Sequence, residues 1–362
     1  MKKLFTIFLA LIMVGTLTAC GGGEKSDFDP IEAFGSDVLN VYNWGEYIGE
    51  DVIRNFENKY NVRVNYSLFD SNEAMYTKLL SGTKYDILVP SDYMIERLID
   101  EDLLQPIDYS LLTNVDLIDP QVIEMREAYD PGGVYSVPYF WGTVGIAYNK
   151  NNISLDELEA KGWEILRDPA HKGSVYMYDS ERDSFMVALK ALGYSMNTSN
   201  MDEIEEANQW LIKLHDTMEP GYVCDEVHDN MINELKDLAV VYSGAAAYII
   251  SENPNIGFYM PKEGTNLWSD DIVIPANAPS PKLAHAFIDF VLEYDSQVDN
   301  SMTVGYTSVN AQVTKDLSAP GEFFDGNEAY VLDSSNPKNE VFKHNETMKK
   351  VLSDLWIKIK VR

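Results

Sequence analysis

Short apolar runs alternate with amphipathic stretches along most of the chain. Unbroken apolar centres at residues 85–91, 174–180 and 238–244 predict strands that are buried on both faces of a sheet. A helix is predicted over 71–80, with Ser71 or Asn72 as its N-cap. Another is predicted over 281–294, where one helical stripe collects Leu283, Ala286, Phe287, Phe290 and Val291. This alternation is typical of α/β folds with mostly parallel sheets.

Aromatic and polar residues follow the predicted strands. The first strand runs into Asn43-Trp44-Gly45-Glu46-Tyr47, and later strands run into Ser91-Asp92-Tyr93, residues 179–183 and Ser243-Gly244. Residues 266–275 add Trp268, Asp270 and Asp271 just before an apolar strand. In open α/β sheets, ligands bind in the crevice at the carboxyl ends of strands. The strand ends are therefore predicted to form one ligand site.

Composition indicates the charge of that ligand. The chain of 362 residues has 28 basic and 58 acidic side chains and a net charge of −30. Such acidity argues against nucleic acid, whose phosphates need Lys and Arg. An ammonium gains about 0.5–2 kcal/mol over an aromatic face and about 1.5–3 kcal/mol from a hydrogen bond to a carboxylate. The clusters therefore suit a cation, with Arg182 as the exception whose side chain can point away from the crevice.

The N-terminal segment predicts export. Lys2 and Lys3 precede the apolar residues 4–15, and small residues precede Cys20, as in a secretory signal. The apolar run is too short to span a membrane comfortably. The site around Cys20 resembles a bacterial lipobox, which implies that Cys20 carries a lipid after residues 1–19 are removed. The mature chain then has a charge of −32, and Cys224 has no intrachain disulfide partner.

Several longer segments occur in a recognisable order: YNWGEYI, FDSNEAMYTKL, YDILVPSDYMI, YSVPYFWGT, DSERDSFMVALKALGYS, YMPKEGTNLWSDDIVIPANA and VGYTSVNAQV. Together they resemble the extracytoplasmic spermidine/putrescine-binding component of polyamine ABC transporters. The resemblance runs from about Val38 to nearly the C-terminus. It implies a type II periplasmic-binding-protein fold, with two lobes that are each a mixed, mostly parallel sheet flanked by helices. The ligand would be a polyamine enclosed between the lobes, without a cofactor or a catalytic reaction.

The resemblance also assigns roles to matching positions. It implies aromatic walls and ligand-loop residues in the first lobe at Trp44, Gly45, Glu46, Tyr47, Ser91, Asp92 and Tyr93. It implies an amine partner at Asp183 and a central clamp, with a further aromatic wall, at Trp268, Asp270 and Tyr306. Three positions depart from the enteric pattern: Ser180 replaces an acid, Tyr242 replaces a tryptophan and Phe342 replaces a glutamine. These departures leave the preference between spermidine and putrescine open.

The expected organisation follows from the same resemblance. Residues 1–19 form the signal peptide and 20–37 a flexible tether. Lobe 1 comprises 38–148 plus 267–315, and lobe 2 comprises 149–266 plus 316–362. The expected partners are a polyamine, the permease subunits of an ABC transporter and the membrane through the lipid anchor. The receptor itself is expected to be a monomer on the outer side of the bacterial cell membrane.

Other functions remain open at this stage. A glycosidase could use Asp92, Asp183 and Asp270 as its acid and base, although no spacing sets two of them at the required separation. A metal-binding lipoprotein could use the dense set Cys224, Asp225, Glu226 and His228, although this spacing specifies no geometry. The same fold could also bind another small organic cation, such as a monoamine or a betaine, because fold alone does not name a ligand.

Overall fold

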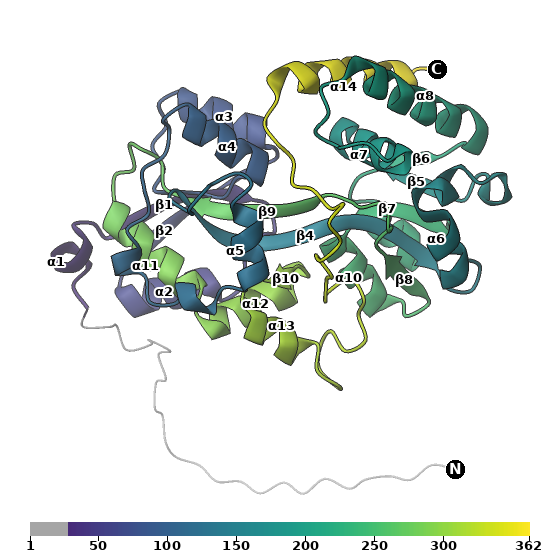
Figure 1. Cartoon of the computed structure of the whole chain (residues 1–362). Helices are drawn as coiled ribbons and strands as arrows, with labels where there is room; N and C mark the ends of the chain where they lie inside the picture. The colour runs from purple at the N-terminus through teal and green to yellow at the C-terminus, as the bar shows by residue number, and fades with distance from the viewer. Residues whose placement is uncertain (1–27) are drawn as a thin grey trace, which may run out of the picture.

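The long strand β4 (Ser136–Asn149) organises the fold, because every one of its residues is buried and it pairs with two groups of strands. The computed structural model describes residues 28–362, and in it β4 runs through both halves of the molecule (Figure 1). As far as Thr143, β4 pairs with β9 (Leu267–Val273) and β10 (Thr307–Ser308). From Val144 onward it pairs with β7 (Leu238–Tyr242) and β8 (Ile256–Tyr259).

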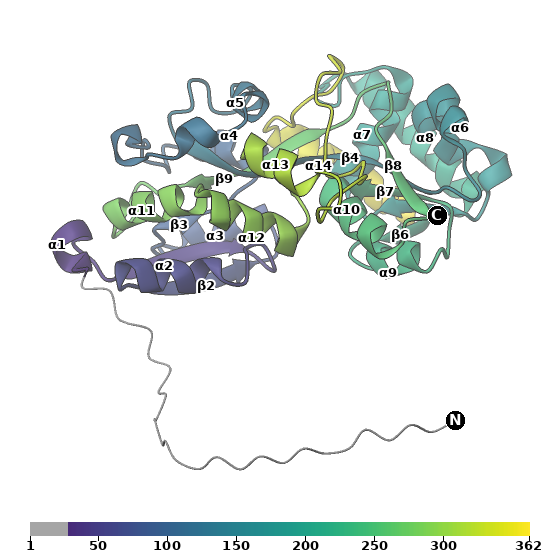
Figure 2. The ribbon, with the colours of Figure 1, turned by 90° about the horizontal axis from the view of Figure 1, so that it is seen from below.

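The first half of the molecule has the strand order β2-β1-β3-β9-β4, in which β1 is parallel to both β2 and β3. Helices cover both faces of this sheet, with α3 and α4 on one face and α2, α11 and α12 on the other (Figures 1 and 2). The remaining elements of this half are α1 (Pro30–Phe34), β1 (Val38–Trp44), α2 (Val52–Tyr60), β2 (Arg63–Phe69), α3 (Asn72–Leu80), β3 (Ile87–Leu88), α4 (Asp92–Asp100), α5 (Pro120–Arg126), α11 (Pro281–Val291), α12 (Tyr294–Val304) and α13 (Ala311–Leu317).

The second half has the order β4-β7-β5-β6, in which β7, β5 and β6 are parallel to one another. Their carboxyl ends therefore lie at one edge of the sheet. The other elements are α6 (Leu155–Lys161), β5 (Val175–Tyr178), α7 (Glu181–Leu192), α8 (Met201–Met218), β6 (Gly221–Val223), α9 (Val227–Ile232), α10 (Ser243–Glu252) and the C-terminal helix α14 (Glu346–Lys360).

The predicted elements are present with some differences. The three predicted strands correspond to β3, β5 and β7, and Ser71 caps α3 by accepting a hydrogen bond from the Ala74 N–H. The sheet is mixed, but it is less parallel than expected, because β4 and β9 run antiparallel to their neighbours. On α11, Ala286 is only half-buried. The predicted signal peptide and Cys20 lie outside the described residues, and no helix within 28–362 is long and apolar enough to cross a bilayer.

Helix α14 joins the two halves through charged contacts. It packs on α7 and α8 of the second half, and its Lys349 Nζ lies 2.6 Å from the Glu73 carboxylate on α3. The Arg97 guanidinium on α4 lies 3.5 Å from Glu346 at the start of α14. Just before α14, the His344 N–H donates to Glu96 of the first half at 2.5 Å. These contacts hold the halves together along this seam.

We expect Lys349→Glu to separate the halves, because it places a like charge opposite Glu73. Exposed pairs of this kind contribute about 0.2–1 kcal/mol, which is enough to shift a balanced equilibrium between closed and open forms. Small-angle X-ray scattering of the ligand-free protein should record a larger radius of gyration. The double substitution Glu73→Lys with Lys349→Glu restores the pair and should return the radius to its original value. An unchanged radius in the single variant would contradict this role for the seam.

Candidate functional site

Tyr47 and Asp270 meet at the end of the first-half strands. The turn after β1 passes through exposed Gly45 and Glu46, where Glu46 has a φ of +50°, and then buries Tyr47. The Tyr47 hydroxyl donates to the Asp270 carboxylate at 2.7 Å. Trp44 is half-buried and its indole N–H donates to the Val89 carbonyl at 2.9 Å. The segment 43–47 at the end of β1 therefore places the ring of Tyr47 against the buried carboxylate of Asp270.

The residues that follow β3 also contact Asp270. Ser91 forms a β-bridge with Asp270, and its hydroxyl accepts a hydrogen bond from the Asn72 amide at 3.0 Å. The same amide donates to the Tyr93 hydroxyl at 2.9 Å. Asp92 differs from its neighbours, because its buried carboxylate accepts hydrogen bonds from the backbone N–H groups of Tyr93 and Ser269. Asn72 is a positioning residue that the sequence did not reveal.

Asp183 is the corresponding acid in the second half. It lies in the first turn of α7 and is 3% exposed. One carboxylate oxygen accepts a hydrogen bond from the Tyr242 hydroxyl at 2.7 Å, and the other has no hydrogen-bond partner among residues 28–362. Ser180 is the N-cap of α7 and accepts a hydrogen bond from the Asp183 backbone N–H at 3.3 Å. The hydroxyl that replaces the family's acid therefore has a structural partner.

Aromatic rings connect the two acids. The Tyr47 ring lies 5.9 Å from Tyr306, which lies 4.8 Å from Trp268, and Trp268 lies 6.1 Å from Tyr242. Asp270 accepts a hydrogen bond from the hydroxyl of Tyr47, and Asp183 accepts one from the hydroxyl of Tyr242. We call this continuous set the aromatic–acid row; its members are Asp270, Tyr47, Tyr306, Trp268, Tyr242 and Asp183.

Two glycines allow the row to form. A Cβ on Gly142 of β4 would come within 2.4 Å of the Trp268 indole. A Cβ on Gly244, at the start of α10, would come within 2.2 Å of the Tyr306 ring. Both rings therefore rest directly on backbone, which brings Trp268 and Tyr306 into edge contact at 84°. Any larger residue at either position would displace a ring from the row.

The two acids carry the electrostatic signature of a cation site. Burial raises the pKa of Asp270 to about 6, against the hydrogen bonds from Ser91 and Tyr47. Burial likewise raises the pKa of Asp183, against the lowering effect of the Tyr242 hydroxyl that donates to it. The Trp268 indole N–H is also buried without a partner in the described part of the chain. A buried charge is costly unless it is paired, so an ammonium beside these carboxylates would offset that cost.

Asp271 plays a different part, although it adjoins Asp270. Its carboxylate accepts hydrogen bonds from the hydroxyls of Tyr129, Ser136 and Ser269. Both of its oxygens therefore have partners, and it ties β9 to the start of β4. The alternation of side chains along a strand separates the two acids, so that one faces the row and its neighbour supports the sheet.

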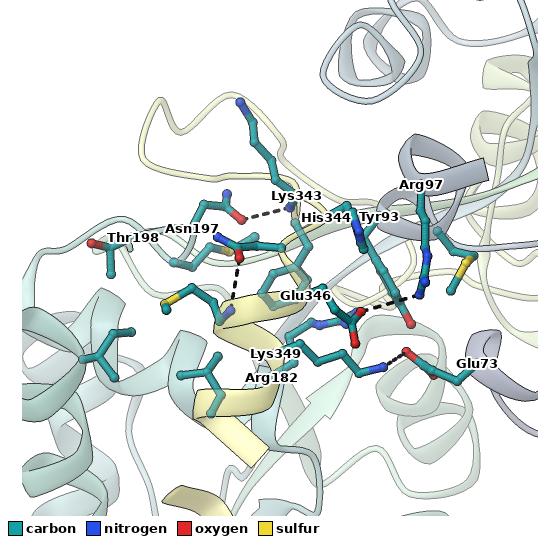
Figure 3. Close-up of a pocket in the computed structure, with 17 residues that line it drawn as sticks. Glu73, Tyr93, Arg97, Arg182, Asn197, Thr198, Lys343, His344, Glu346 and Lys349 are labelled. Carbon is teal, nitrogen blue, oxygen red and sulfur yellow. Dashed lines mark hydrogen bonds and ion pairs between the residues drawn. The ribbon is translucent and has the colours of Figure 1, made fainter. Parts of the chain in front are cut away.

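A measurable pocket lies beside the row rather than along it. Its volume is about 210 Å³, and of the predicted ligand residues only Tyr93 lines it (Figure 3). The Arg182 guanidinium from the second half lies 3.5 Å from the centre of the Tyr93 ring. Arg182 therefore does not point away from the site, as the sequence allowed, but covers the aromatic face that a ligand ammonium would otherwise use.

One residue of the row's surroundings was missed. Tyr178 ends β5 and its ring packs against Tyr242 at 5.0 Å. Ligands of α/β sheets bind at the carboxyl ends of strands, and Tyr178 is the last residue of its strand, so the same reasoning could have identified it. The contact between its ring and Tyr242 extends the aromatic lining toward β6.

The potential metal ligands of the described residues lie elsewhere. Glu157, Asp168 and His171 converge, but Lys161 already forms ion pairs with both carboxylates. Within residues 28–362, the Cys224–His228 segment forms no such convergent group. The sequence-based metal hypothesis for that segment therefore has no geometric support here.

The raised pKa of Asp270 predicts a pH dependence. Between the ordinary pKa of 3.8 and the folded value of about 6, the folded protein keeps a proton that the unfolded chain has lost. The free energy of unfolding should therefore fall as pH rises through this window, by on the order of 2–3 kcal/mol at full effect. Asp270→Asn should remove this contribution, so that its thermal midpoint relative to wild type rises from pH 4.5 to pH 7.5.

The matched control is Asp100→Asn, at the exposed end of α4. Its difference from wild type should stay constant across the same pH range. A constant difference for Asp270→Asn as well would show that folding does not raise the pKa of Asp270 and would contradict this prediction.

Comparisons with known proteins agree with this geometry. Residues 51–324 match the family described as bacterial extracellular solute-binding protein. A spermidine/putrescine-binding periplasmic protein of Salmonella typhimurium is 34% identical over 285 residues, which cover 78% of this chain and 80% of the relative. The solved spermidine/putrescine ABC transporter substrate-binding protein PotD of Streptococcus pneumoniae is 35% identical, with a TM-score of 0.78 and coverage of 90% of this chain and 99% of its own.

The TpPotD lipoprotein of Treponema pallidum is a further structural neighbour, 28% identical with a TM-score of 0.76 and coverage of 90% of this chain and 100% of its own. These similarities confirm the two-lobed α/β fold expected from the sequence. The relatives are binding components of transporters rather than enzymes, which removes the glycosidase alternative. The chain belongs to the bacterial extracellular solute-binding protein family.

Proposed function

We propose that this protein is an extracytoplasmic polyamine receptor that captures its ligand between the two lobes and delivers it to an ABC permease. One observation carries the proposal: Asp270 and Asp183 stand at opposite ends of the aromatic–acid row and belong to opposite halves of the molecule. A thin chain with an ammonium at each end matches that arrangement. The names of the relatives, which bind spermidine and putrescine, support the same ligand class.

The energetics favour a dication over a neutral ligand. Each ammonium that pairs with a buried carboxylate contributes about 1.5–3 kcal/mol, and each aromatic face adds about 0.5–2 kcal/mol. The Tyr47 and Tyr242 hydroxyls each donate a hydrogen bond to one of these acids. The unpartnered oxygen of Asp183 leaves room for a further donor. A ligand amine would add to these bonds and neutralise the buried charges.

We propose the following residues as ligand-binding: Trp44, Gly45, Glu46, Tyr47, Ser91, Asp92, Tyr93, Ser180, Asp183, Tyr242, Trp268, Asp270 and Tyr306. Their roles are unequal. Tyr47, Tyr242 and the other members of the aromatic–acid row contribute most, because they contact one another around the two acids. Asp92 contributes least, because both oxygens of its carboxylate already accept hydrogen bonds from backbone N–H groups.

Ligand binding is expected to favour closure, because only the closed arrangement brings both acids to the same molecule. The lobes that close are proposed as 38–148 with 267–315 and 149–266 with 316–362. Support comes from β4, which passes from one half to the other, although its partners change between Thr143 and Val144, a few residues before the proposed boundary at 148. The ion pairs of the α14 seam connect the same two halves. The ligand therefore shifts an equilibrium that the seam already biases.

We further propose that residues 1–19 are cleaved, that Cys20 is lipid-modified and that the segment between Cys20 and α1 tethers a monomeric receptor to the cell membrane. The flexible tether expected over 20–37 is too long, because Pro30–Phe34 form α1 and Phe34 packs against Tyr60. The signal-like N-terminus and the small residues before Cys20 support this anchor. The Treponema pallidum neighbour is itself named a lipoprotein. Labelling with radioactive palmitate, compared between wild type and Cys20→Ala, tests the anchor directly.

Isothermal titration calorimetry with putrescine, spermidine, spermine and betaine tests the ligand class. Asp183→Asn and Asp270→Asn should each weaken putrescine binding by about 2–4 kcal/mol, because a buried ammonium loses its partner. Asp271→Asn is the matched control. It should lower the thermal midpoint, since one of the two acceptor oxygens becomes an NH2 donor that faces hydroxyl donors, but leave putrescine affinity within about twofold. Tighter binding of betaine than of any polyamine would overturn the proposed ligand.

Ser180→Asp should strengthen binding of spermidine relative to putrescine by restoring an acid at this position. Aspartate is also a good N-cap, so α7 should keep its start. The control is Ser180→Asn, which caps equally well without the charge. If Ser180→Asp and Ser180→Asn give the same ratio of the two dissociation constants, charge at this position does not set the preference.

A further inference from the structure

One end of the aromatic–acid row is closed to additional ammonium groups. The Arg182 guanidinium covers Tyr93 at 3.5 Å and lies 5.3 Å from the Phe342 ring. The adjoining pocket has an excess of positive charge, because Arg97, Lys343 and Lys349 join Arg182 there and only Glu73 and Glu346 oppose them (Figure 3). An ammonium that extended in this direction would meet a fixed cation and would find its aromatic faces occupied. A longer polyamine must therefore extend in another direction.

The other direction leads to the carboxyl end of β6. Strand β6 is parallel to β5, with Val223 opposite Tyr178, and the Asp179 N–H donates to the Val223 carbonyl at 2.9 Å. Both strands therefore end at the same edge of the sheet, and the chain leaves β6 through Cys224 and Asp225 toward α9 (Figure 2). Asp225 is exposed, so a bound ligand can reach its carboxylate.

The strand register places Asp225 near the row, because Asp225 lies two residues beyond Val223, which is opposite Tyr178, and the Tyr178 ring contacts Tyr242 at 5.0 Å. The electrostatic surroundings of two tyrosines agree with this position. Burial raises the pKa of Tyr178, and the charges of Asp183, Cys224 and Asp225 raise it further. Burial also raises the pKa of Tyr306, and the next contributions come from Tyr178, Asp270 and Asp225. Asp225 thus acts on rings that also feel the two buried acids of the row. Within the row, one oxygen of Asp183 has no hydrogen-bond partner among residues 28–362, so it can accept a hydrogen bond from a ligand.

We propose, on the basis of the proposed polyamine function, that Asp225 is a specificity-determining residue that receives the third ammonium of a triamine. Ligand ammonium groups pair first with the two buried acids, because leaving a charge unpaired costs the most free energy where water is excluded. A diamine can neutralise Asp270 and Asp183 and then has no charge left for Asp225. A triamine has one, and it cannot place that charge beside Arg182. Asp225 thereby supplies the acid that Ser180 lacks.

Calorimetric titration of Asp225→Asn with putrescine and spermidine tests the proposal. Spermidine should bind about five- to tenfold more weakly, in line with one partly exposed charge-assisted hydrogen bond, and putrescine affinity should change by less than about twofold. The control is Asp229→Asn, which removes an equally exposed acid from α9. It should leave the ratio of the two dissociation constants unchanged. Equal thermal midpoints would establish that both variants are folded.

Three outcomes would overturn the proposal: an unchanged ratio in Asp225→Asn, an equal loss for both ligands, or the same change in Asp229→Asn. The last would mean that overall negative charge, rather than Asp225, attracts the ligand. Each of these outcomes contradicts only the role of Asp225 and leaves the proposed receptor function intact. If the wild-type protein binds neither putrescine nor spermidine, the receptor assignment itself is wrong.

Discussion

The site depends on the cost of burying two carboxylates without a cation. Asp270 and Asp183 are almost fully enclosed, and burial raises the pKa of each. A core built for stability alone would replace such groups with apolar residues, because a buried charge rarely repays its desolvation. The protein keeps both acids and joins them by aromatic rings. This arrangement becomes favourable when a cation occupies it, so ligand affinity and the instability of the empty site have the same physical origin.

The fold gives this site its two-sided character through one strand. Because β4 passes from the first half to the second, the halves share a rigid connection while each keeps its own parallel strands. The carboxyl ends of those strands face one another, which brings Tyr47 and Tyr242 to opposite ends of the same row. The seam at α14 adds ion pairs of modest energy, as suits a contact that must break and re-form. Strong apolar packing at the seam would instead lock the halves together.

Much of this site could be predicted from the sequence, because strand ends in α/β folds are local features. The motif around Trp44 and the pair Trp268–Asp270 stand out as aromatic and acidic residues after apolar runs. Individual orientations were harder to predict. Asp92 and Asp270 are both acids at strand ends, yet the backbone N–H groups of Tyr93 and Ser269 donate to the first, while the second faces the row. Hydrogen bonds between residues far apart in the sequence determine which way each carboxylate points, and these bonds cannot be predicted from composition.

Arg182 illustrates the same limit and explains how selectivity can arise. In the sequence it is a basic residue among acids, which suggests that it avoids the site. In the structure its charge lies against Tyr93, where it competes with any ligand ammonium for the ring. The positive charge at one end and the carboxylates along the rest give the site a direction. Additional ammonium groups of a ligand can then bind only on the acidic side, so the number of charges on the ligand, rather than its length alone, determines how much of the site it fills.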